Sequence, residues 1–422
     1  KMNKHFSNTL LTVLLCGLSL SPVAMAKVEL KSIIQKAMAN DPTLDEAKAN
    51  IAMAQSQTKI SEAGHLPVVA LTGTSVINQY HRDTSDRHSG PGVNARLNLY
   101  AWGGIEAEIE RDRHKEGYYQ HKLIETREIM GQRIGQLYLT ALRAKESIAA
   151  YQESLIRHEK ILKDLNVIVR YDSGRQSDVN EALSRRNQVE SALLTQQRIM
   201  QSALNQLTRY TRKPISEADL VDPFAKIAVN DFIKRYHSAD ITFNPSYQAQ
   251  QKEFDSAAAA VRAAKARQMP AINLEGNASR HNQEIYINMS WDIYNPANEY
   301  TKQQSYYSQQ AAEAKLREIE LDIQEKALTS EVDMVRSRDL ARVAHKQIAL
   351  QRKVVADTEM QFEIANRSLL NVLDAYQELT GVQMAGITAR NDFRDAALLY
   401  LASQAKIAGW AGDKVRLDFK TF

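Results

Sequence analysis

Cysteine is almost absent from this sequence: among 422 residues, only Cys16 is a cysteine. The scarcity excludes a disulfide framework, and it argues against a thiol nucleophile or a thiolate metal site. No stretch of 18 apolar residues follows residue 26, so we expect no bilayer-spanning helix there. The 54 Lys+Arg nearly balance the 50 Asp+Glu, for a net charge of +4, which argues against a protein that binds nucleic acid by charge.

Proline is also scarce, and its nine residues are unevenly placed: none occurs from 92 to 213 and none after 296. Two very long helices are therefore permitted, over 104–170 and 297–364. In the first, apolar residues from Ile134 to Val169 follow a strict 3-4 spacing that only His158 interrupts. This heptad pattern predicts coiled-coil-like packing along a rod about 100 Å long.

The first 26 residues have the composition of a secretory signal peptide. Lys1 and Lys4 precede an apolar run, and the small-residue triplet 24–26 predicts cleavage before Lys27. Cys16 lies inside this leader, and Leu15 before it argues against lipoprotein acylation. We therefore expect an exported chain whose mature part contains no cysteine.

The sequence repeats itself at a fixed spacing. Pro42 and Pro245 are 203 residues apart, as are Pro67 and Pro270. After each second proline come two segments in which apolar and polar residues alternate, which predicts strands with one apolar and one polar face. The expected strands are 68–80, 93–100, 271–279 and 284–294.

Each half therefore reads as helix, β-hairpin, long helix, short turn and helix. The turns near 171–177 and 362–368 match at an offset of 191, which the longer first hairpin loop explains. The expected organisation is signal peptide 1–26, first repeat 27–210 with hairpin 67–100, linking segment 211–242, second repeat 243–409 with hairpin 270–294, and C-terminal segment 410–422.

The alternating strands have two interpretations. They could form a half-buried sheet on a soluble core. Their length, their terminal aromatics and the export signal instead favour strands that cross an outer membrane. Four strands cannot close a barrel alone, and an open edge is not tolerated in lipid, so three chains would have to share twelve strands.

The order of these elements, the duplication, and residues 365–375 (ANRSLLNVLDA) resemble the TolC family of trimeric outer-membrane channels. The resemblance spans essentially the whole mature chain. It implies a mainly α fold with a small β part: internally duplicated long helical hairpins forming a trimeric α-barrel, continuous with a 12-stranded outer-membrane β-barrel. It also implies an equatorial belt from 211–242 and 410–422, and periplasmic tips that meet an adaptor protein.

Two positions depart from the family pattern. Ala365 stands where the second turn usually has glycine, and a left-handed alanine costs about 1 kcal/mol, so we expect this turn to differ in shape. Asn371 replaces the first of two aspartates, which leaves Asp374 as the only charge of that pair. With one charge per subunit in place of two, the resemblance implies a channel that prefers cations less strongly. The register of the first tip stays open, since Ser177 aligned with Ser368 and Glu181 aligned with Asp374 differ by two residues.

These patterns suggest three sets of functional residues. A periplasmic gate is expected at Asp374 and Asn371, which share a helix face, with Arg367 and Asp178 as latch residues; the alternative is that Asp374 is a solvated helix charge. The expected adaptor-contacting tip residues are Gly174, Arg175, Ser177, Ala365, Asn366 and Ser368. The expected lipid-facing residues are Ile285, Ile287, Met289, Trp291 and Ile293. No catalytic, cofactor or metal site is expected.

The function expected from this sequence is a passive exit path from periplasm to outside. The expected partners are two further copies of the chain, an adaptor protein, an inner-membrane transporter and outer-membrane lipid. We expect the exported substrate to be a protein, by type I secretion, because no acylation site is convincing and the equatorial segments are short. Multidrug or small-molecule efflux is the alternative. A periplasmic coiled-coil adaptor without a pore is the competing class, and an enzyme is a distant third.

Overall fold

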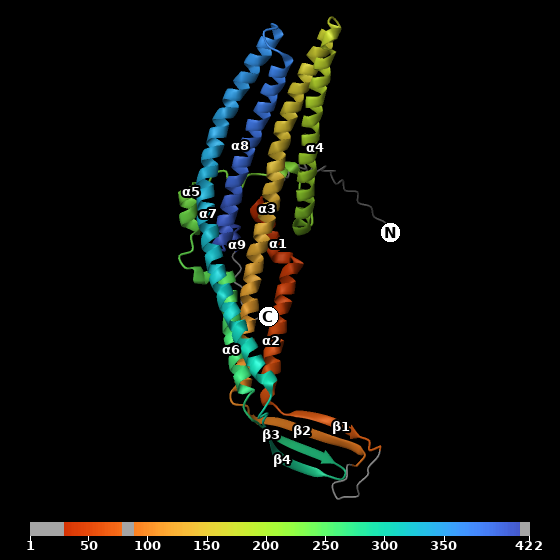
Figure 1. Cartoon of the computed structure of the whole chain (residues 1–422), viewed down its shortest axis with the longest axis vertical. Coiled ribbons are helices and arrows are strands. Elements are labelled where there is room, and N and C mark those ends of the chain that lie inside the picture. Colours follow the sequence, from red (N-terminus) through yellow and green to blue (C-terminus); the bar gives the residue numbers. More distant parts are fainter. Residues whose placement is uncertain (1–28, 78–87, 414–422) are drawn as a thin grey trace, which may run out of the picture.

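The computed structural model describes residues 29–77 and 88–413, which form one elongated molecule (Figure 1). A four-stranded sheet lies at one end, and the turns between long helices lie at the other. We call these the sheet end and the tip end. The predicted mainly helical fold with four strands is confirmed; the predicted signal peptide lies outside the described residues.

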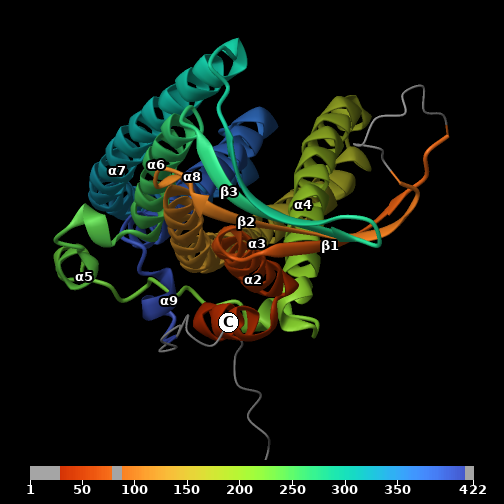
Figure 2. The same cartoon turned by 90° about the horizontal axis from the view of Figure 1, so that it is seen from below.

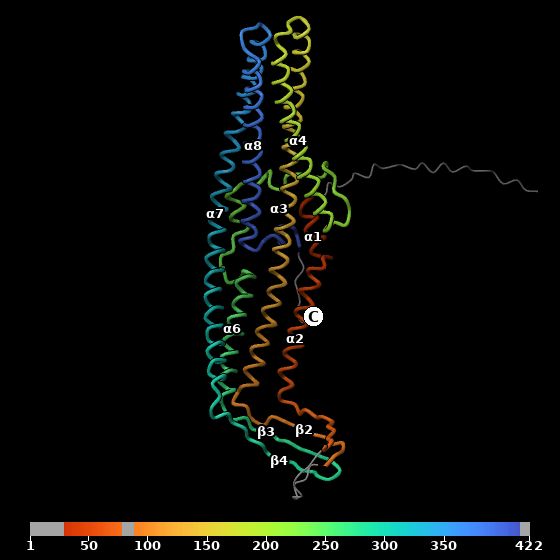
Figure 3. The backbone as a smooth tube through the Cα atoms, turned by 45° about the vertical axis from the view of Figure 1, so that its right-hand side comes forward, coloured from red at the N-terminus to blue at the C-terminus, as the bar shows by residue number. Residues whose placement is uncertain are grey.

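Two helices run most of the length of the molecule. Helix α3 (Gly104–Val169) has 66 residues and α7 (Pro296–Glu363) has 68, so each spans about 100 Å. The shorter helices accompany them in pairs (Figure 3): α2 (Pro42–Glu62) and α6 (Pro245–Ala266) toward the sheet end, and α4 (Gln176–Thr211) and α8 (Leu369–Ser403) toward the tip end. Because α3 packs against all four shorter helices, it is the centre of the layer. Figure 2 shows α7 and α4 on opposite sides of α3.

Three of these helices begin with the same local device. Asp41, Asn244 and Asn295 each precede a proline at the first helical position. Each side chain accepts a hydrogen bond from the backbone N–H two residues on, at 2.9, 2.9 and 3.2 Å. Proline has no N–H that would lack an acceptor at the first helical position, and the Asp or Asn side chain accepts the N–H of the residue after it. The two residues together fix the helix start.

The four strands form one antiparallel sheet in the order β1-β2-β3-β4. Their bounds are β1 (Val68–Thr74), β2 (Gly90–Tyr100), β3 (Ala271–Ser279) and β4 (Gln283–Ser290). The central pair joins the two repeats, with Leu97 opposite Leu274, and a register shift follows Asn98. The expected strands 68–80 and 284–294 are too long. Ser290 pairs with Ala271, and the next position on β3 would be Pro270, which has no N–H to donate to the ladder.

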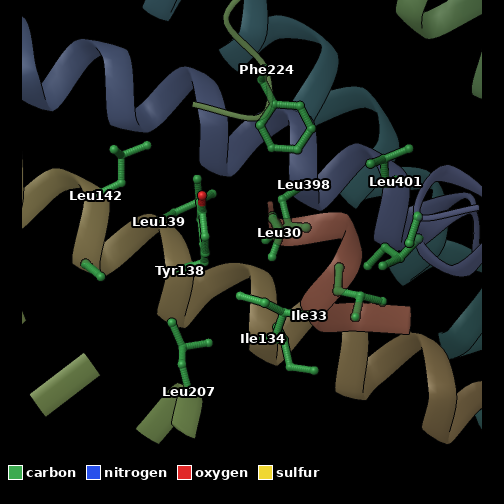
Figure 4. Close-up of a cluster of buried hydrophobic side chains, with 14 of the residues drawn as sticks. Leu30, Ile33, Ile134, Tyr138, Leu139, Leu142, Leu207, Phe224, Leu398 and Leu401 are labelled. Atoms are coloured by element: carbon green, nitrogen blue, oxygen red, sulfur yellow. The ribbon is translucent and has the colours of Figure 1, made fainter. Parts of the chain in front are cut away.

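Buried side chains form two separate clusters. The waist cluster, at mid-length, joins α1 (Leu30–Asn40), α3, α4, α8, α9 (Ile407–Trp410) and the segment after α4. Figure 4 labels ten of its members: Leu30, Ile33, Ile134, Tyr138, Leu139, Leu142, Leu207, Phe224, Leu398 and Leu401. The tip cluster consists of Ile161, Leu162, Leu165, Val179, Ala182, Val355, Phe362, Leu369, Val372, Leu373, Ala375, Tyr376, Leu379 and Val382. The heptad seam predicted on α3 supplies residues to both clusters.

A buried arginine ties the linking segment to the waist. Arg394 of α8, 2 % exposed, donates from Nε to Asp222 at 2.8 Å and from both terminal nitrogens to Glu146 of α3 at 2.7 and 3.0 Å. Beside it, the Tyr138 hydroxyl donates to the carbonyl of Val221 and accepts from its N–H, at 3.0 and 2.8 Å. Segment 212–228 and the short helix α5 (Val229–Tyr236) thus lie against the middle of the long helices.

Candidate functional site

The first tip is a short turn stabilised by an aspartate. Helix α3 ends at Val169 and α4 begins at Gln176, and the Asp172 carboxylate accepts the N–H of Gly174 at 3.0 Å. Arg175 donates from Nε to Asp178 at 2.8 Å and lies over the Phe362 ring at 5.8 Å. The contact with Phe362 connects the first tip to the end of α7.

The second tip closes with a left-handed residue. Ala365 has φ +58°, its N–H donates to the carbonyl of Phe362, and the N–H of Asn366 donates to the carbonyl of Gln361, both at 2.9 Å. This pair of bonds is the Schellman motif, in which glycine is the usual left-handed residue. Alanine thus adopts the left-handed conformation that this motif uses, and the expected difference from the family's turn stays a prediction.

Helix α8 begins with a capping box. The Ser368 hydroxyl accepts the N–H of Asn371 at 3.4 Å, and the side-chain oxygen Oδ1 of Asn371 accepts from the N–H and hydroxyl of Ser368, at 3.3 and 2.8 Å. The Asn371 side chain is therefore engaged by the helix start, a role that aspartate could also fill. The sequence pattern Ser-x-x-Asn carried this signal.

The helix starts fix the relation between the two tips. Helix α4 begins at Gln176 and α8 at Leu369, 193 residues apart, which favours the alignment of Glu181 with Asp374 over that of Ser177 with Ser368. Ser177 lies inside α4, whereas Ser368 precedes α8. In the favoured register Asp178 corresponds to Asn371 and Glu181 to Asp374.

An arginine that sequence reasoning missed joins the two tips below these turns. Arg185 of α4 donates from Nη2 to Asp374 at 3.5 Å and from Nε to Glu181 at 3.1 Å, and its other terminal nitrogen bonds Gln377. Asp374 remains 58 % exposed at its side chain. The spacing of Glu181 and Arg185, four apart on a helix, was the only local signal for this residue.

The four expected gate residues do not form one cluster within the chain. Arg367 donates to Gln361 at 2.8 Å, Asp178 pairs with Arg175, Asn371 caps α8, and Asp374 meets Arg185. Arg367 and Asp374 project from the same tip and are both exposed. The latch role of Arg367 and Asp178 stays a prediction about contacts between chains.

The expected adaptor-contacting residues all lie at the tip end, at the turn or in the first residues of the following helix. Five are exposed, namely Gly174, Ser177, Ala365, Asn366 and Ser368, and Arg175 is half-buried. Large apolar side chains accompany them: Tyr171 is 90 % exposed and Ile364 is 71 % exposed. The tips therefore present an accessible surface with both apolar and charged groups.

At the sheet end, the polar face of the sheet is hydrogen-bonded across the strands. Asn98 donates to Asn273 at 3.0 Å, and Asn94 likewise bonds Asn277. Glu275 accepts from the Tyr286 hydroxyl at 2.9 Å and from Asn288 at 3.3 Å. These pairs use the register in which Glu275 lies opposite Tyr286.

The other face of the sheet is apolar and exposed. Ile285, Ile287 and Met289 on β4 are 80, 67 and 64 % exposed, and Leu71 on β1 is 82 % exposed. Trp291 and Ile293, expected on the same strand face, lie beyond the end of β4 instead. Trp291 donates its indole N–H to the carbonyl of Gln268 at 3.0 Å, which fixes the exit from the sheet.

The described residues contain neither a cluster for a metal nor a helix for crossing a membrane. In 29–77 and 88–413, no three His, Cys, Asp or Glu side chains are arranged to hold a metal ion. No described helix has a segment long and apolar enough to span a bilayer.

The comparisons with known proteins agree with this geometry. Residues 33–211 match the family model "Outer membrane efflux protein", while no curated protein matches the chain. The Campylobacter jejuni CmeC outer membrane channel is 12% identical with a TM-score of 0.75. The alignment covers 93% of this chain and 88% of CmeC. The outer membrane protein VceC from Vibrio cholerae is 15% identical with a TM-score of 0.72, covering 89% and 96%. The Neisseria gonorrhoeae MtrE outer membrane channel is 15% identical with a TM-score of 0.67, covering 89% and 88%.

At these identities the structures show the fold alone, and the family model matches less than half of the chain. The resemblance to TolC-like outer-membrane channels is confirmed, and the chain has their fold. The general role of a transport channel in the outer membrane is supported, and the matched family is one of efflux proteins, not of enzymes.

Proposed function

We propose that three copies of this chain form an outer-membrane channel that gives a substrate a passive exit path from the periplasm. The observation that carries the proposal is the sheet, which has two unpaired outer strands, β1 and β4, and one exposed apolar face. In lipid each outer strand needs a partner, and β1 of one copy can pair with β4 of the next. Three copies then give a closed barrel of twelve strands.

The flank of α7 supports the same assembly. It carries large exposed apolar side chains at helical spacing, among them Leu321, Leu328, Val343 and Leu350, each at least 60 % exposed. Helix α7 lies on one side of the helical layer and α4 on the other (Figure 2), so a ring of copies would bring α7 of one beside α4 of its neighbour. A stripe of this kind is typical of an unpaired association surface.

The tips are the proposed gate and the proposed contact with the rest of the export machinery. Threefold symmetry would repeat Asp374 as a ring of three carboxylates around the axis. The proposed partners are a periplasmic adaptor at the exposed tip residues and an inner-membrane transporter that supplies the energy. The channel itself needs no chemistry beyond a water-filled path.

The substrate class separates two versions of this proposal. The sequence favoured protein secretion, whereas the description of the matched family favours efflux of small molecules, and we adopt efflux. Deleting the chain in its host should then increase sensitivity to toxic compounds and leave proteins in the culture medium unchanged. Loss of one secreted protein with unchanged sensitivity would restore the secretion version.

Mass measurement of the detergent-solubilised protein tests the assembly, and a trimer is expected. Ile287→Arg or Met289→Arg should block it, at about 2 to 4 kcal/mol per site near the middle of the membrane. Asn288→Arg and Ser290→Arg, on the polar face, are the matched controls and should be tolerated. A monomer, or equal effects on both faces, would reject the proposed barrel.

Single-channel recording tests the gate. Asp374→Ala should reduce cation selectivity and block by multivalent cations, because it removes the charge from the proposed ring. Arg367→Ala should raise the closed-state conductance by loosening the tip. Unchanged conductance, selectivity and cation block in both variants would remove the gate from these residues.

A further inference from the structure

The interior of the helical layer is divided by a polar band. On α3 the waist cluster ends at Ile148, with Tyr151 and Leu155 packed against it, and the tip cluster begins at Ile161. On α8 the tip cluster ends at Val382 and the waist cluster begins at Phe393. The residues of this polar band are Glu153, Ser154, Arg157, His158, Arg352, Thr380 and Gln383.

Hydrogen bonds in the band cross between the two repeats. Glu153 of α3 accepts from Gln383 of α8 at 2.8 Å and from Arg352 of α7 at 3.3 Å. The hydroxyls of Ser154 and Thr380 lie 2.9 Å apart, and both residues are buried. Among the described residues, two buried atoms of the band, Nε of Arg157 and Oε1 of Gln383, have no hydrogen-bond partner. A buried polar network that is only partly satisfied costs stability, so the band is a weak level of the α3–α8 contact.

His158 is the titratable side chain at the centre of this contact. It is 3 % exposed, its Nδ1–H donates to the carbonyl of Ser154 at 2.8 Å, and its ring meets the edge of Tyr376 of α8 with centroids 5.3 Å apart. Burial lowers the pKa of His158, and the charges of Arg157 and Arg185 lower it further. The neutral imidazole fits this packing.

The charged groups around His158 offer little to an imidazolium. Arg157 of its own helix and Arg185 of α4 are cations. From α8 comes the phenol of Tyr376, which bonds the Glu359 carboxylate of α7, and burial and that bond raise the pKa of Tyr376. The carboxylates near these groups already have partners: Glu359 lies 3.8 Å from Lys160, Glu153 bonds Arg157 at 2.8 Å, and Glu181 and Asp374 bond Arg185.

We propose that the polar band is the level at which the tip half of the helices bends away from the waist, and that protonation of His158 promotes this bending. An imidazolium at this buried position needs hydration that the packing of α3 against α8 at Tyr376 excludes, and the charges of Arg157 and Arg185 disfavour it further, so protonation favours separation of the two helices. Arg185 also holds Asp374, so the same movement would reach the gate residue. The bending needs only the folded chain; that it opens a pore rests on the proposed function.

The direction of the pH effect follows from the lowered pKa. A histidine whose pKa is lower in the packed state than in the open state stabilises the closed tip. This stabilisation is fully present above the ordinary histidine pKa of about 6.5. That contribution is lost as the pH falls through the lowered value. Acid should therefore open the tip, while neutral pH keeps it closed.

Hydrogen exchange of the whole assembled protein tests the proposal. After correction for the intrinsic pH dependence of exchange, the backbone protection of 160–182 and 355–376 should fall about threefold or more between about pH 7.5 and 5.5. Protection of the waist, 130–148, should not fall over this range. His158→Gln, whose amide can still donate to Ser154, should remove the response. His345→Gln, at an exposed histidine on α7, is the matched control and should keep it.

Loss of the response in both variants, or a wild-type tip with no response, would overturn the proposal. If His158→Gln fails to fold, exchange at the imidazole C2 hydrogen of the wild type decides instead, and a His158 pKa at or above about 6.5 overturns it. Bilayer recordings separate the two proposals. Acid loosening without any channel would reject the proposed function alone, and channels with a tip that ignores pH would reject the polar band alone.

Discussion

The waist and the tip are both buried, but they are held together differently. The waist cluster includes residues of the N-terminal helix α1, the C-terminal helix α9 and the linking segment. Beside it, Arg394 is bonded by two carboxylates. The tip cluster is built from the ends of α3, α4, α7 and α8 alone. The waist is thus joined through many chain segments, whereas the tip, in our proposal, bends away from it at the polar band. Four predictions test this difference.

The largest effect is expected at the waist arginine. Arg394→Met should lower the free energy of unfolding by about 3 to 5 kcal/mol, because it leaves Glu146 and Asp222 without their buried partner. Arg390→Met is the control: Arg390 is 45 % exposed and lies 3.7 Å from the same Glu146, so its loss should cost less than about 1 kcal/mol. Urea unfolding measures both. Equal costs would show that the waist does not depend on burial of this pair.

A matched pair of leucines compares the two clusters directly. Leu139 in the waist and Leu373 in the tip are both 0 % exposed. Each alanine variant should lose about 2 to 5 kcal/mol of local packing. In Leu139→Ala the loss should appear in global urea unfolding, and in Leu373→Ala chiefly in hydrogen exchange of the tip. Identical global losses would mean that tip and waist unfold as one unit.

The waist should respond to acid in the direction opposite to the tip. Partial desolvation and the neighbouring Asp392 together raise the pKa of Asp395 to about 6, although Arg143 and Asn391 lower it. The folded state therefore binds a proton more readily than the unfolded state, and stability should increase as the pH falls from 7 through about 6. Asp395→Asn should flatten this rise in thermal unfolding, while Asp392→Asn should weaken it. A waist that loses stability over that range would contradict the prediction.

The smallest effect is expected at the tip turns. Ala365→Gly should stabilise the second tip by about 1 kcal/mol, because glycine adopts the left-handed conformation without strain. Gly174→Ala in the first tip should change little, since Gly174 does not have a positive φ. Exchange of the amides that follow each turn measures both. If Gly174→Ala stabilised the first tip and Ala365→Gly left the second unchanged, the prediction would be wrong.

Local patterns in the sequence were sufficient to predict where most of the long helices and strands lie. The 3-4 spacing on α3 predicted a helix that ends at 170, one residue past the observed Val169. Alternation placed β3 at its observed bounds, because the two faces of a strand differ over each successive pair of residues. It extended β4 too far, because alternation continues to Tyr294 while the ladder stops opposite Pro270. The missing donor belongs to another strand and is invisible in the local pattern.

The sequence by itself determined the duplicated order of helices and hairpins, the two faces of the sheet and the apolar seam, since each depends on residues a few positions apart. Only the tertiary structure decided which side chains meet across long distances in the chain. It paired Arg185 with Asp374 and Arg394 with Glu146 and Asp222, and it engaged Asn371 in a helix cap. It also buried His158 against Tyr376, so that the residue that interrupts the apolar seam contacts another helix. Such pairings depend on how helices pack, and packing is set by the whole layer and not by any single segment.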